Sequence, residues 1–268
     1  MQKLLLSQVV YNHPGGNMES QFDDLPSLYE NMAEWPFRRD VEIPNVFATL
    51  GDVRNRDILD FGCGNGMYSR WLKKRGADKV VGYDVSEGML RYARRWEEED
   101  PVGIEFISNL PPESDGQFDI VLAVYVLPYA RTVDELRKLC AQMTRPLKPG
   151  GRLITLPIHP DYVRDRRYYE PMGLRLAPFG DDVDGGKVQL DLFMGSFSAQ
   201  VTAYVWSRES LDDALYRAGS SIVQWVEYGR MRDGQHPTVD SSLQAYLDKP
   251  HAALLNCVIG AHSVDAAG

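Results

Sequence analysis

Cysteine is scarce in this chain of 268 residues: only Cys63, Cys140 and Cys257 occur, far apart and without a CxxC pair. This pattern argues against a disulfide framework and a zinc site, and it is typical of a reducing cytoplasm. Long apolar runs are also lacking, since the longest, Ile120 to Leu127, is far shorter than the about 20 residues that cross a bilayer. Met1 to Val10 lacks the length and cleavage site of a secretory signal. We therefore expect a cytoplasmic protein without a membrane partner.

Basic residues are in deficit as well: 29 lysines and arginines stand against 38 aspartates and glutamates, for a formal net charge of −9. A chain of this charge is repelled by a phosphate backbone unless it carries a local basic patch, and its basic clusters are short. Nucleic acid is therefore not an expected partner. The composition, 44% apolar and 25% charged, is ordinary for a folded globular protein.

Strand and helix signals alternate between residues 51 and 160. Phe118–Val124 is a continuous apolar run, which is typical of a strand buried on both faces of a sheet. Ser86 and the segment Thr132 to Glu135 carry the N-cap signals of helices that follow strands. The other strands expected here are Asp57–Phe61, Lys79–Asp84, Gly103–Ile107 and Arg152–Leu156. Repeated βα units of this length predict a parallel, doubly wound sheet.

The pattern changes after residue 160. Residues 161–186 are rich in proline, glycine, aspartate, tyrosine and arginine, and we expect an irregular excursion there. Two extended segments around Gly195-Ser196 then predict a β-hairpin, and two late strands complete the sheet. The hairpin is expected over Lys187–Met194 and Phe197–Trp206, followed by a helix over Ser207–Gly219 and strands at Ser221–Tyr228 and Leu254–His262.

These segments predict a single α/β domain over residues 1–268, with a mostly parallel, seven-stranded, doubly wound sheet of Rossmann-like type and an inserted β-hairpin cap. Residues 1–50 form an N-terminal extension and a helical lid, residues 51–160 the core, residues 161–206 the cap insertion and residues 207–268 the C-terminal part of the sheet. Met18 begins the recognisable stretch, so residues 1–17 are either an extension or a mis-assigned start.

The segment Ile58-Leu-Asp-Phe-Gly-Cys-Gly-Asn-Gly66 lies between an expected strand and an expected helix. Its glycines allow a tight turn close to a ligand, and open α/β sheets bind ligands beyond the carboxyl ends of their strands. Asp60 stands two residues before the first glycine, where it can face an ammonium group. Asp84 ends the second strand, 20 positions after Gly64 (84 − 64), where a carboxylate can accept hydrogen bonds from both ribose hydroxyls. The set predicts a site for S-adenosylmethionine (SAM), which makes residues 51–160 a SAM-binding core.

A nicotinamide dinucleotide is the alternative ligand for a glycine-rich turn of this kind. Its fingerprint is Gly-x-Gly-x-x-Gly, whose third glycine eases the packing of the helix on the strand. Here Gly62 and Gly64 are followed by Met67 at the third position, and Asp60 would repel a phosphate. SAM is therefore favoured.

Several segments together resemble the class I SAM-dependent methyltransferases: Asp60-Phe-Gly-Cys-Gly-Asn-Gly66, Asp84, Phe118-Asp-Ile-Val and Leu147-Lys-Pro-Gly-Gly151. A narrower resemblance, to toxoflavin-synthase-like methyltransferases and the N-methyltransferases of lincosamide and amino-sugar pathways, spans about residues 25–255. It rests on Trp35-Pro-Phe-Arg38, Gly82 to Met89, Tyr125 to Ala130 and Tyr246-Leu-Asp-Lys-Pro250. The resemblance implies methyl transfer to a nitrogen of a small natural-product intermediate, with S-adenosylhomocysteine (SAH) as the product of SAM and no metal.

The resemblance also implies a set of cofactor contacts, although the chain departs from the family pattern at two places. The loop after the third strand, which often carries Gly-Asp, reads Ser108-Asn-Leu110, and Asn109 can still bind the adenine amino group. Leu156-Pro-Ile-His-Pro160 replaces a polar, asparagine-rich segment. Arg38 can pair with the methionine carboxylate, and Tyr29 can close over that end. The predicted cofactor contacts are Tyr29, Arg38, Asp60, Gly62, Cys63, Gly64, Gly66, Asp84, Val85, Met89, Asn109, Leu110, Ala123 and Tyr125.

Two side chains are candidates for a role at the reacting atoms. Tyr125 follows the fourth strand and can line the methyl channel, and His159 follows the fifth strand and can act as a base or orient the acceptor. A neutral amine needs no strong base, so N-methylation by alignment is expected, with O-methylation through His159 as the alternative. A SAM-binding protein without transferase activity, or a SAM-dependent cyclase, is a further alternative. The identity of the small-molecule acceptor and the oligomeric state, a homo-oligomer included, stay open.

Overall fold

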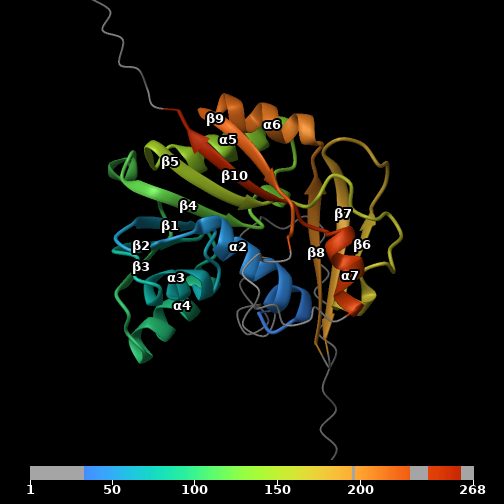
Figure 1. Cartoon of the computed structure of the whole chain (residues 1–268), viewed down its shortest axis with the longest axis horizontal. Helices are drawn as coiled ribbons and strands as arrows, with labels where there is room; N and C mark the ends of the chain where they lie inside the picture. Colours follow the sequence, from blue (N-terminus) through green and yellow to red (C-terminus); the bar gives the residue numbers. More distant parts are fainter. Residues whose placement is uncertain (1–32, 195–196, 230–240, 261–268) are drawn as a thin grey trace, which may run out of the picture.

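The structure of the protein is a computed structural model, and it describes residues 33–194, 197–229 and 241–260. Its main element is a seven-stranded sheet with the strand order β3-β2-β1-β4-β5-β10-β9 (Figure 1). Strands β1 to β5 run parallel to one another, and β10 is antiparallel to both of its neighbours, β5 and β9. The predicted mostly parallel sheet of Rossmann-like type is therefore confirmed.

The seven strands begin and end close to the predicted positions. They are β1 Asp57–Phe61, β2 Lys79–Tyr83, β3 Ile104–Ile107, β4 Phe118–Val124, β5 Leu147–Leu156, β9 Ser220–Val226 and β10 Leu254–Ile259. The largest difference is in β5, which was expected to start at Arg152. It starts at Leu147 because the segment expected to form a turn already pairs with β4, with a register shift between Phe118 and Ile120.

Helices cover both faces of this sheet, as a doubly wound fold requires. Alternate residues of a strand point to opposite faces, so Ile58 packs against the helices of one face and Leu59 against those of the other. The first face carries α2 Ile43–Leu50, α3 Met67–Lys74 and α4 Glu87–Glu99, and the second carries α5 Val133–Thr144 and α6 Arg208–Arg217 (Figure 1). Each face is thereby closed by its own apolar core.

The predicted N-caps are in place. Ser86 Oγ accepts a hydrogen bond from the Met89 amide at 3.2 Å, and Thr132 Oγ1 accepts one from the Glu135 amide at 3.2 Å. The reciprocal half of the expected capping box is absent between these described residues, because the Glu135 carboxylate accepts from Arg131 instead. Both helices therefore start directly after a loop that follows a strand of the sheet.

A second sheet of three antiparallel strands stands beside the first (Figure 1). The predicted hairpin is confirmed as β7 Gly186–Met194 and β8 Phe197–Val205. The expectation that residues 161–186 are irregular throughout is wrong, because β6 Leu174–Pro178 pairs with β7. This cap sheet shares an apolar core with Trp35 and Phe37 of the N-terminal segment and with the helix α7 Ser241–Asp248.

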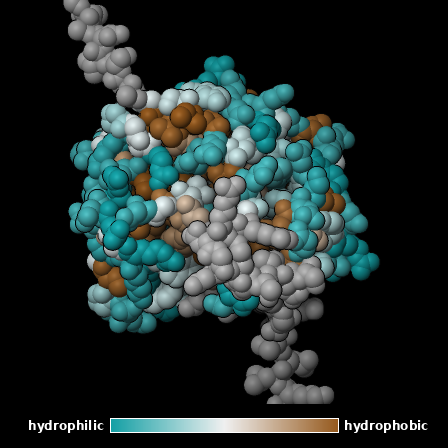
Figure 2. Space-filling model, in the orientation of Figure 1, coloured by the Kyte–Doolittle hydropathy of each residue, from teal (hydrophilic) through white to brown (hydrophobic). Residues whose placement is uncertain are grey.

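The surface seen in Figure 2 is mainly hydrophilic, with apolar side chains in separate patches. Within the described ranges, no helix is long and apolar enough to span a membrane. Tyr29 and residues 1–17 lie outside the described residues, as do the last two residues of the strand that was expected to reach His262.

Candidate active site

The glycine-rich segment forms the predicted turn between β1 and α3. The Gly62 and Cys63 amides donate to the carbonyl of Tyr83 at 2.7 and 2.9 Å, which holds the turn over the end of β2. Gly62 has a φ of +74°, and a Cβ there would stand 2.6 Å from a methyl carbon of Val126. Only glycine fits this position, because both the backbone conformation and the neighbouring side chain exclude a larger residue.

Asp84 follows β2 and faces this turn. One carboxylate oxygen accepts from the Gly64 amide at 2.7 Å, and the other accepts from the Ser86 amide at 2.9 Å. The carboxylate is half-buried. The acid that ends the second strand is thus in direct contact with the glycine turn, and its predicted contact with the ribose stays a prediction.

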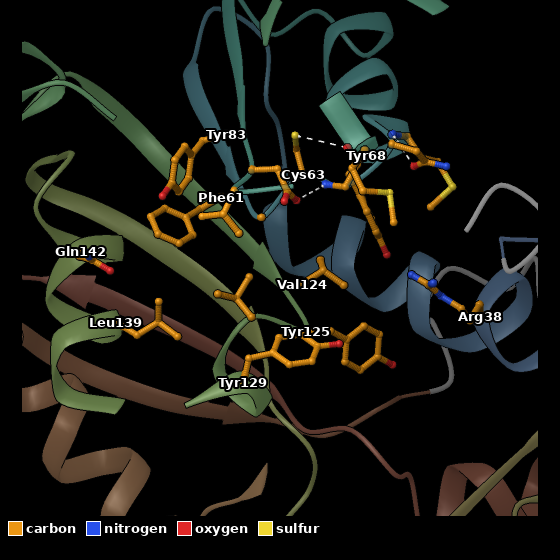
Figure 3. A pocket seen from close by; sticks show the side chains of 18 residues that line it. Arg38, Phe61, Cys63, Tyr68, Tyr83, Val124, Tyr125, Tyr129, Leu139 and Gln142 are labelled. Carbon is orange, nitrogen blue, oxygen red and sulfur yellow. Dashed lines mark hydrogen bonds between the residues drawn. The ribbon is translucent and has the colours of Figure 1, made fainter. Parts of the chain in front are cut away.

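A cavity of about 300 Å³ lies between this turn and the residues that follow β4. Figure 3 shows Cys63 and Tyr68 on one side of it, Tyr125 and Tyr129 on the other, and Arg38 at one end. Its lining comes from the turn, the ends of β1, β2 and β4, the helices α3, α4 and α5, the segment before α2 and the segment after β4. The lining residues are Arg38, Phe61, Gly62, Cys63, Gly64, Asn65, Met67, Tyr68, Tyr83, Asp84, Val85, Met89, Val124, Tyr125, Val126, Tyr129, Leu139 and Gln142.

Asp60 lies in β1 and is buried, with 2% of its surface exposed. Its carboxyl accepts a hydrogen bond from the Ser69 hydroxyl at 2.6 Å. Burial, opposed by the Ser69 bond and reinforced by the nearby charge of Asp84, raises the pKa of Asp60 to about 7. Near neutral pH this carboxyl is therefore only partly ionised, and a cation close by would favour its charged form.

Tyr125 stands at the centre of a buried polar cluster. Its φ of +59° is rare for a residue with a side chain. The hydroxyl donates to the carboxylate of Glu42, which also accepts from Arg38 Nε at 2.9 Å. Arg38 and Glu42 are 3% and 0% exposed, so they neutralise each other away from solvent. Burial, reinforced by the Glu42 charge, holds the pKa of Tyr125 well above its ordinary value, so the hydroxyl keeps its proton.

His251 completes the cluster. Its Nε2 lies 3.2 Å from the Tyr125 hydroxyl, its Nδ1 lies 3.0 Å from the Tyr246 hydroxyl, and its ring stacks on that of Tyr125. Because Tyr125 gives its one proton to Glu42, His251 must donate through Nε2 and accept from Tyr246 at Nδ1. Burial, together with the positive charge of Arg38, lowers the pKa of His251 to about 3, so the ring is neutral.

A second, smaller cavity of about 50 Å³ adjoins the first and shares Arg38, Tyr125 and Tyr129 with it. His251 lines this second cavity. Its other walls are apolar side chains, most of them from the cap sheet. The cap predicted from the sequence thus covers a space next to the larger cavity.

The structure places the predicted site residues in two groups. Eight line the larger cavity: Arg38, Gly62, Cys63, Gly64, Asp84, Val85, Met89 and Tyr125. Six described residues line neither cavity: Asp60, Gly66, Asn109, Leu110, Ala123 and His159. Asp60 lies in β1, Gly66 lies at the start of α3, and Ala123 lies in β4. Asn109 is exposed on the loop after β3. Their cofactor roles stay predictions, and Tyr29 lies outside the described residues.

His159 was predicted to act as a base or to orient the acceptor, but it lines neither cavity. Its ring packs edge-on against Trp225, and its Nδ1 accepts from the Asp161 amide at 3.0 Å. The backbone amide of His159 donates to the carbonyl of His251 at 2.8 Å. The histidine next to Tyr125 is therefore His251, not His159.

Sequence reasoning missed Glu42 and His251, both of which bond to Tyr125. Glu42 lies four residues after Arg38, a spacing that allows an ion pair on a helix and could have been noticed. His251 directly follows the segment Tyr246-Leu-Asp-Lys-Pro250, which had already been singled out. The contact with Tyr125 spans 126 positions, so no local pattern could reveal it.

Comparisons with known proteins agree with this geometry. Residues 58–151 match a family model described as a methyltransferase domain, and this stretch holds the glycine turn, Asp84 and Tyr125. The crystal structure of an S-adenosylmethionine dependent methyltransferase from Mesorhizobium loti superposes with a TM-score of 0.55, at 22% identity, over 85% of this chain and 99% of that one. The predicted fold is thus confirmed: the chain has the Rossmann-like methyltransferase fold, and residues 58–151 match a methyltransferase domain.

Two curated relatives are similar to this chain in sequence. The chain is 31% identical to a ubiquinone biosynthesis O-methyltransferase of Bordetella avium, over 50% of this chain and 51% of that protein. It is 29% identical to a demethylmenaquinone methyltransferase of Renibacterium salmoninarum, over 68% of each chain. The chain spans about half the length of the ubiquinone-biosynthesis relatives that it matches.

Proposed function

We propose that this protein is a SAM-dependent methyltransferase that acts on a small molecule. One observation carries the proposal: the glycine turn, Asp84 and Tyr125 meet around one cavity of about 300 Å³ at the carboxyl ends of parallel strands. Open α/β sheets bind ligands at this place, and the volume is within the range of small-molecule sites. The methyltransferase domain matched by residues 58–151 supports the same function.

The residues around the cavity fit SAM. No described atom lies within 4 Å of the position that a Cβ on Gly64 would take, so its backbone is open to a ligand. A carboxylate offers several lone pairs, so Asp84 can hold the ribose hydroxyls while it holds the turn. Val85 and Met89 offer apolar surface to the adenine side. Bound SAM supplies a methyl group on a sulfonium, and the chain aligns the reactants and excludes water.

We propose nitrogen as the methylated atom, in a natural-product intermediate, on the strength of the resemblance to N-methyltransferases. Methylation of oxygen is the second candidate, because several of the relatives are named as O-methyltransferases and because the site offers a route for a proton. On that route the Tyr125 oxygen would take the acceptor's proton as its own proton passes to the Glu42 carboxylate, so Tyr125 ends the step still protonated. It replaces the route through His159, which lines neither cavity.

The proposed partners are SAM and a small acceptor. The net charge of −9 gives no support to a nucleic-acid partner. Cys63, Cys140 and Cys257 are all free and buried, which supports the proposal of a reducing, cytoplasmic location.

A turnover assay tests the proposal. The protein is incubated with SAM and a panel of phenols and secondary amines, SAH release is measured, and the methylated atom is located by mass spectrometry and NMR. We expect SAH release that depends on the acceptor. SAH binding without turnover of any acceptor would favour the reading of a SAM-binding protein without transferase activity.

Two glycine variants sharpen the assay. Gly64 and Gly116 have φ values of +55° and +66°, and in neither case does a described atom lie within 4 Å of an added Cβ. Gly64→Ala and Gly116→Ala should therefore each cost about 1 kcal/mol of stability. Only Gly64 lines the cavity, so only Gly64→Ala should slow SAH release. Equal activity of the two variants would contradict the proposed cofactor site.

A further inference from the structure

One wall of the smaller cavity is formed by alternate residues of the cap-sheet strands. Residues on one face of the cap sheet alternate along each strand, and Leu174, Leu176, Leu190 and Leu192 all point to this space. The register pairs Leu174 with Leu192 and Leu176 with Leu190, so the four side chains form one apolar patch on two neighbouring strands.

Val201 and Ala203 of β8 extend this patch, since Val201 pairs with Leu190. Both are buried, with 2% of their surface exposed. The next residue between them, Thr202, does not line the cavity. The wall is therefore formed by one face of the sheet. A charged group buried against it would lose its hydration without compensation, so a charged ligand is disfavoured.

Three members of the polar cluster around Tyr125 also line this cavity: Arg38, Tyr125 and His251. The hydroxyl of Tyr125 has one proton, which it gives to Glu42, and it faces Nε2–H of His251. What the Tyr125 oxygen can still offer to a molecule in the cavity is an acceptor lone pair. An uncharged ligand with its own hydroxyl or N–H would satisfy that lone pair, whereas a ligand without a donor would not.

The volume limits the size of what enters. A cavity of about 150 Å³ holds a benzene molecule, and this one measures about 50 Å³. Part of a small ring or a short alkyl group fits the space, and the rest of the molecule must lie in the adjoining cavity of about 300 Å³. Arg38, Tyr125 and Tyr129 line both spaces, so the two cavities adjoin at these side chains.

We propose that the smaller cavity binds the apolar end of the methyl acceptor, and that Tyr125 positions the acceptor by accepting a hydrogen bond from its hydroxyl or N–H group. The acceptor class is thus an uncharged, largely apolar small molecule with a hydrogen-bond donor at the atom to be methylated. This inference rests on the proposed methyltransferase function and adds to it the chemistry of the acceptor.

Two ring compounds of matched size test the inference without requiring turnover. 4-Fluorophenol carries a hydroxyl where 4-fluorotoluene carries a methyl group, and ¹⁹F NMR measures the binding of each to the protein saturated with SAH. We expect both to bind the wild-type protein. The Tyr125→Phe variant should lower the ratio of phenol affinity to toluene affinity about tenfold, because one hydrogen bond is lost. An unchanged ratio would overturn the role of Tyr125.

Two substitutions in β8 test the apolar wall. Ala203→Val fills the cavity and should weaken both compounds about tenfold or more, whereas Thr202→Val puts the same side chain on the neighbouring position and should change neither affinity. Equal effects of the two substitutions would overturn the cavity assignment.

The SAH titration separates this inference from the proposed function. A wild-type protein that binds SAH but neither ring compound contradicts the acceptor site alone. A wild-type protein that does not bind SAH contradicts the proposed function itself.

Discussion

Replacing Asp60 by asparagine should remove a large pH dependence from the stability of the protein. The folded protein holds Asp60 with a pKa of about 7, against an ordinary value of 3.8, chiefly because the carboxyl is buried. Between these values the folded state binds the proton and the unfolded state has lost it, so stability falls as the pH rises. Between these two pKa values the free energy of unfolding falls by about 1.4 kcal/mol for each pH unit. From pH 5 to pH 8 the wild-type protein should therefore lose about 3 kcal/mol relative to Asp60→Asn.

Urea denaturation at several pH values measures this difference. Asparagine keeps an oxygen for the Ser69 hydroxyl, so the hydrogen bond of 2.6 Å can persist in the variant. Other groups titrate in both proteins and cancel in the comparison. Asp134→Asn is the matched control, because the Asp134 side chain is 90% exposed and should show the wild-type pH dependence. Parallel curves for the wild type and Asp60→Asn would refute the reasoning.

Three further substitutions give sharp expectations. Gly62→Ala should lower the free energy of unfolding, measured by urea denaturation, by about 3 kcal/mol. The reason is that the added Cβ would stand 2.6 Å from Val126 on a backbone with a φ of +74°. A decrease of less than about 0.5 kcal/mol would contradict this. Arg70→Ala should cost about 2 kcal/mol, since Arg70 is 3% exposed and pairs with Glu97 at 2.8 Å; an unchanged urea midpoint would argue against the pair. His159→Ala should leave the rate of SAH formation unchanged, and a loss that high pH restores would return His159 to the mechanism.

The sheet and its cofactor turn could be predicted from the sequence because their signals are local. The apolar run of β4 matches Phe118–Val124 at both ends, and the glycines after β1 have the positive φ values that the turn requires. Asp84 follows the second strand as predicted and contacts the Gly64 amide. Physical constraints of this kind act between residues that are close in the chain or in adjacent βα units.

The acceptor side could not be predicted because its contacts are long-range. The strand β6 lies in a segment of strand-breaking composition and forms because β7 pairs with it. Glu42, Tyr125 and His251 meet from three distant parts of the chain, and nothing near His251 shows that its ring stacks on Tyr125. The choice of His159 followed the usual position at the end of a core strand, whereas the fold turns its ring toward Trp225.

Calorimetric titration of the protein with SAH, repeated with Asp84→Asn and with Asp134→Asn, tests the central claim most directly. The wild type and Asp134→Asn should bind SAH alike, and Asp84→Asn should bind it about tenfold more weakly, because asparagine keeps one acceptor oxygen and loses one hydrogen bond to a carboxylate at about 1.5 kcal/mol. No heat from the wild-type protein, or equal affinity in all three proteins, would contradict the claim that the glycine turn and Asp84 hold the nucleoside of SAM.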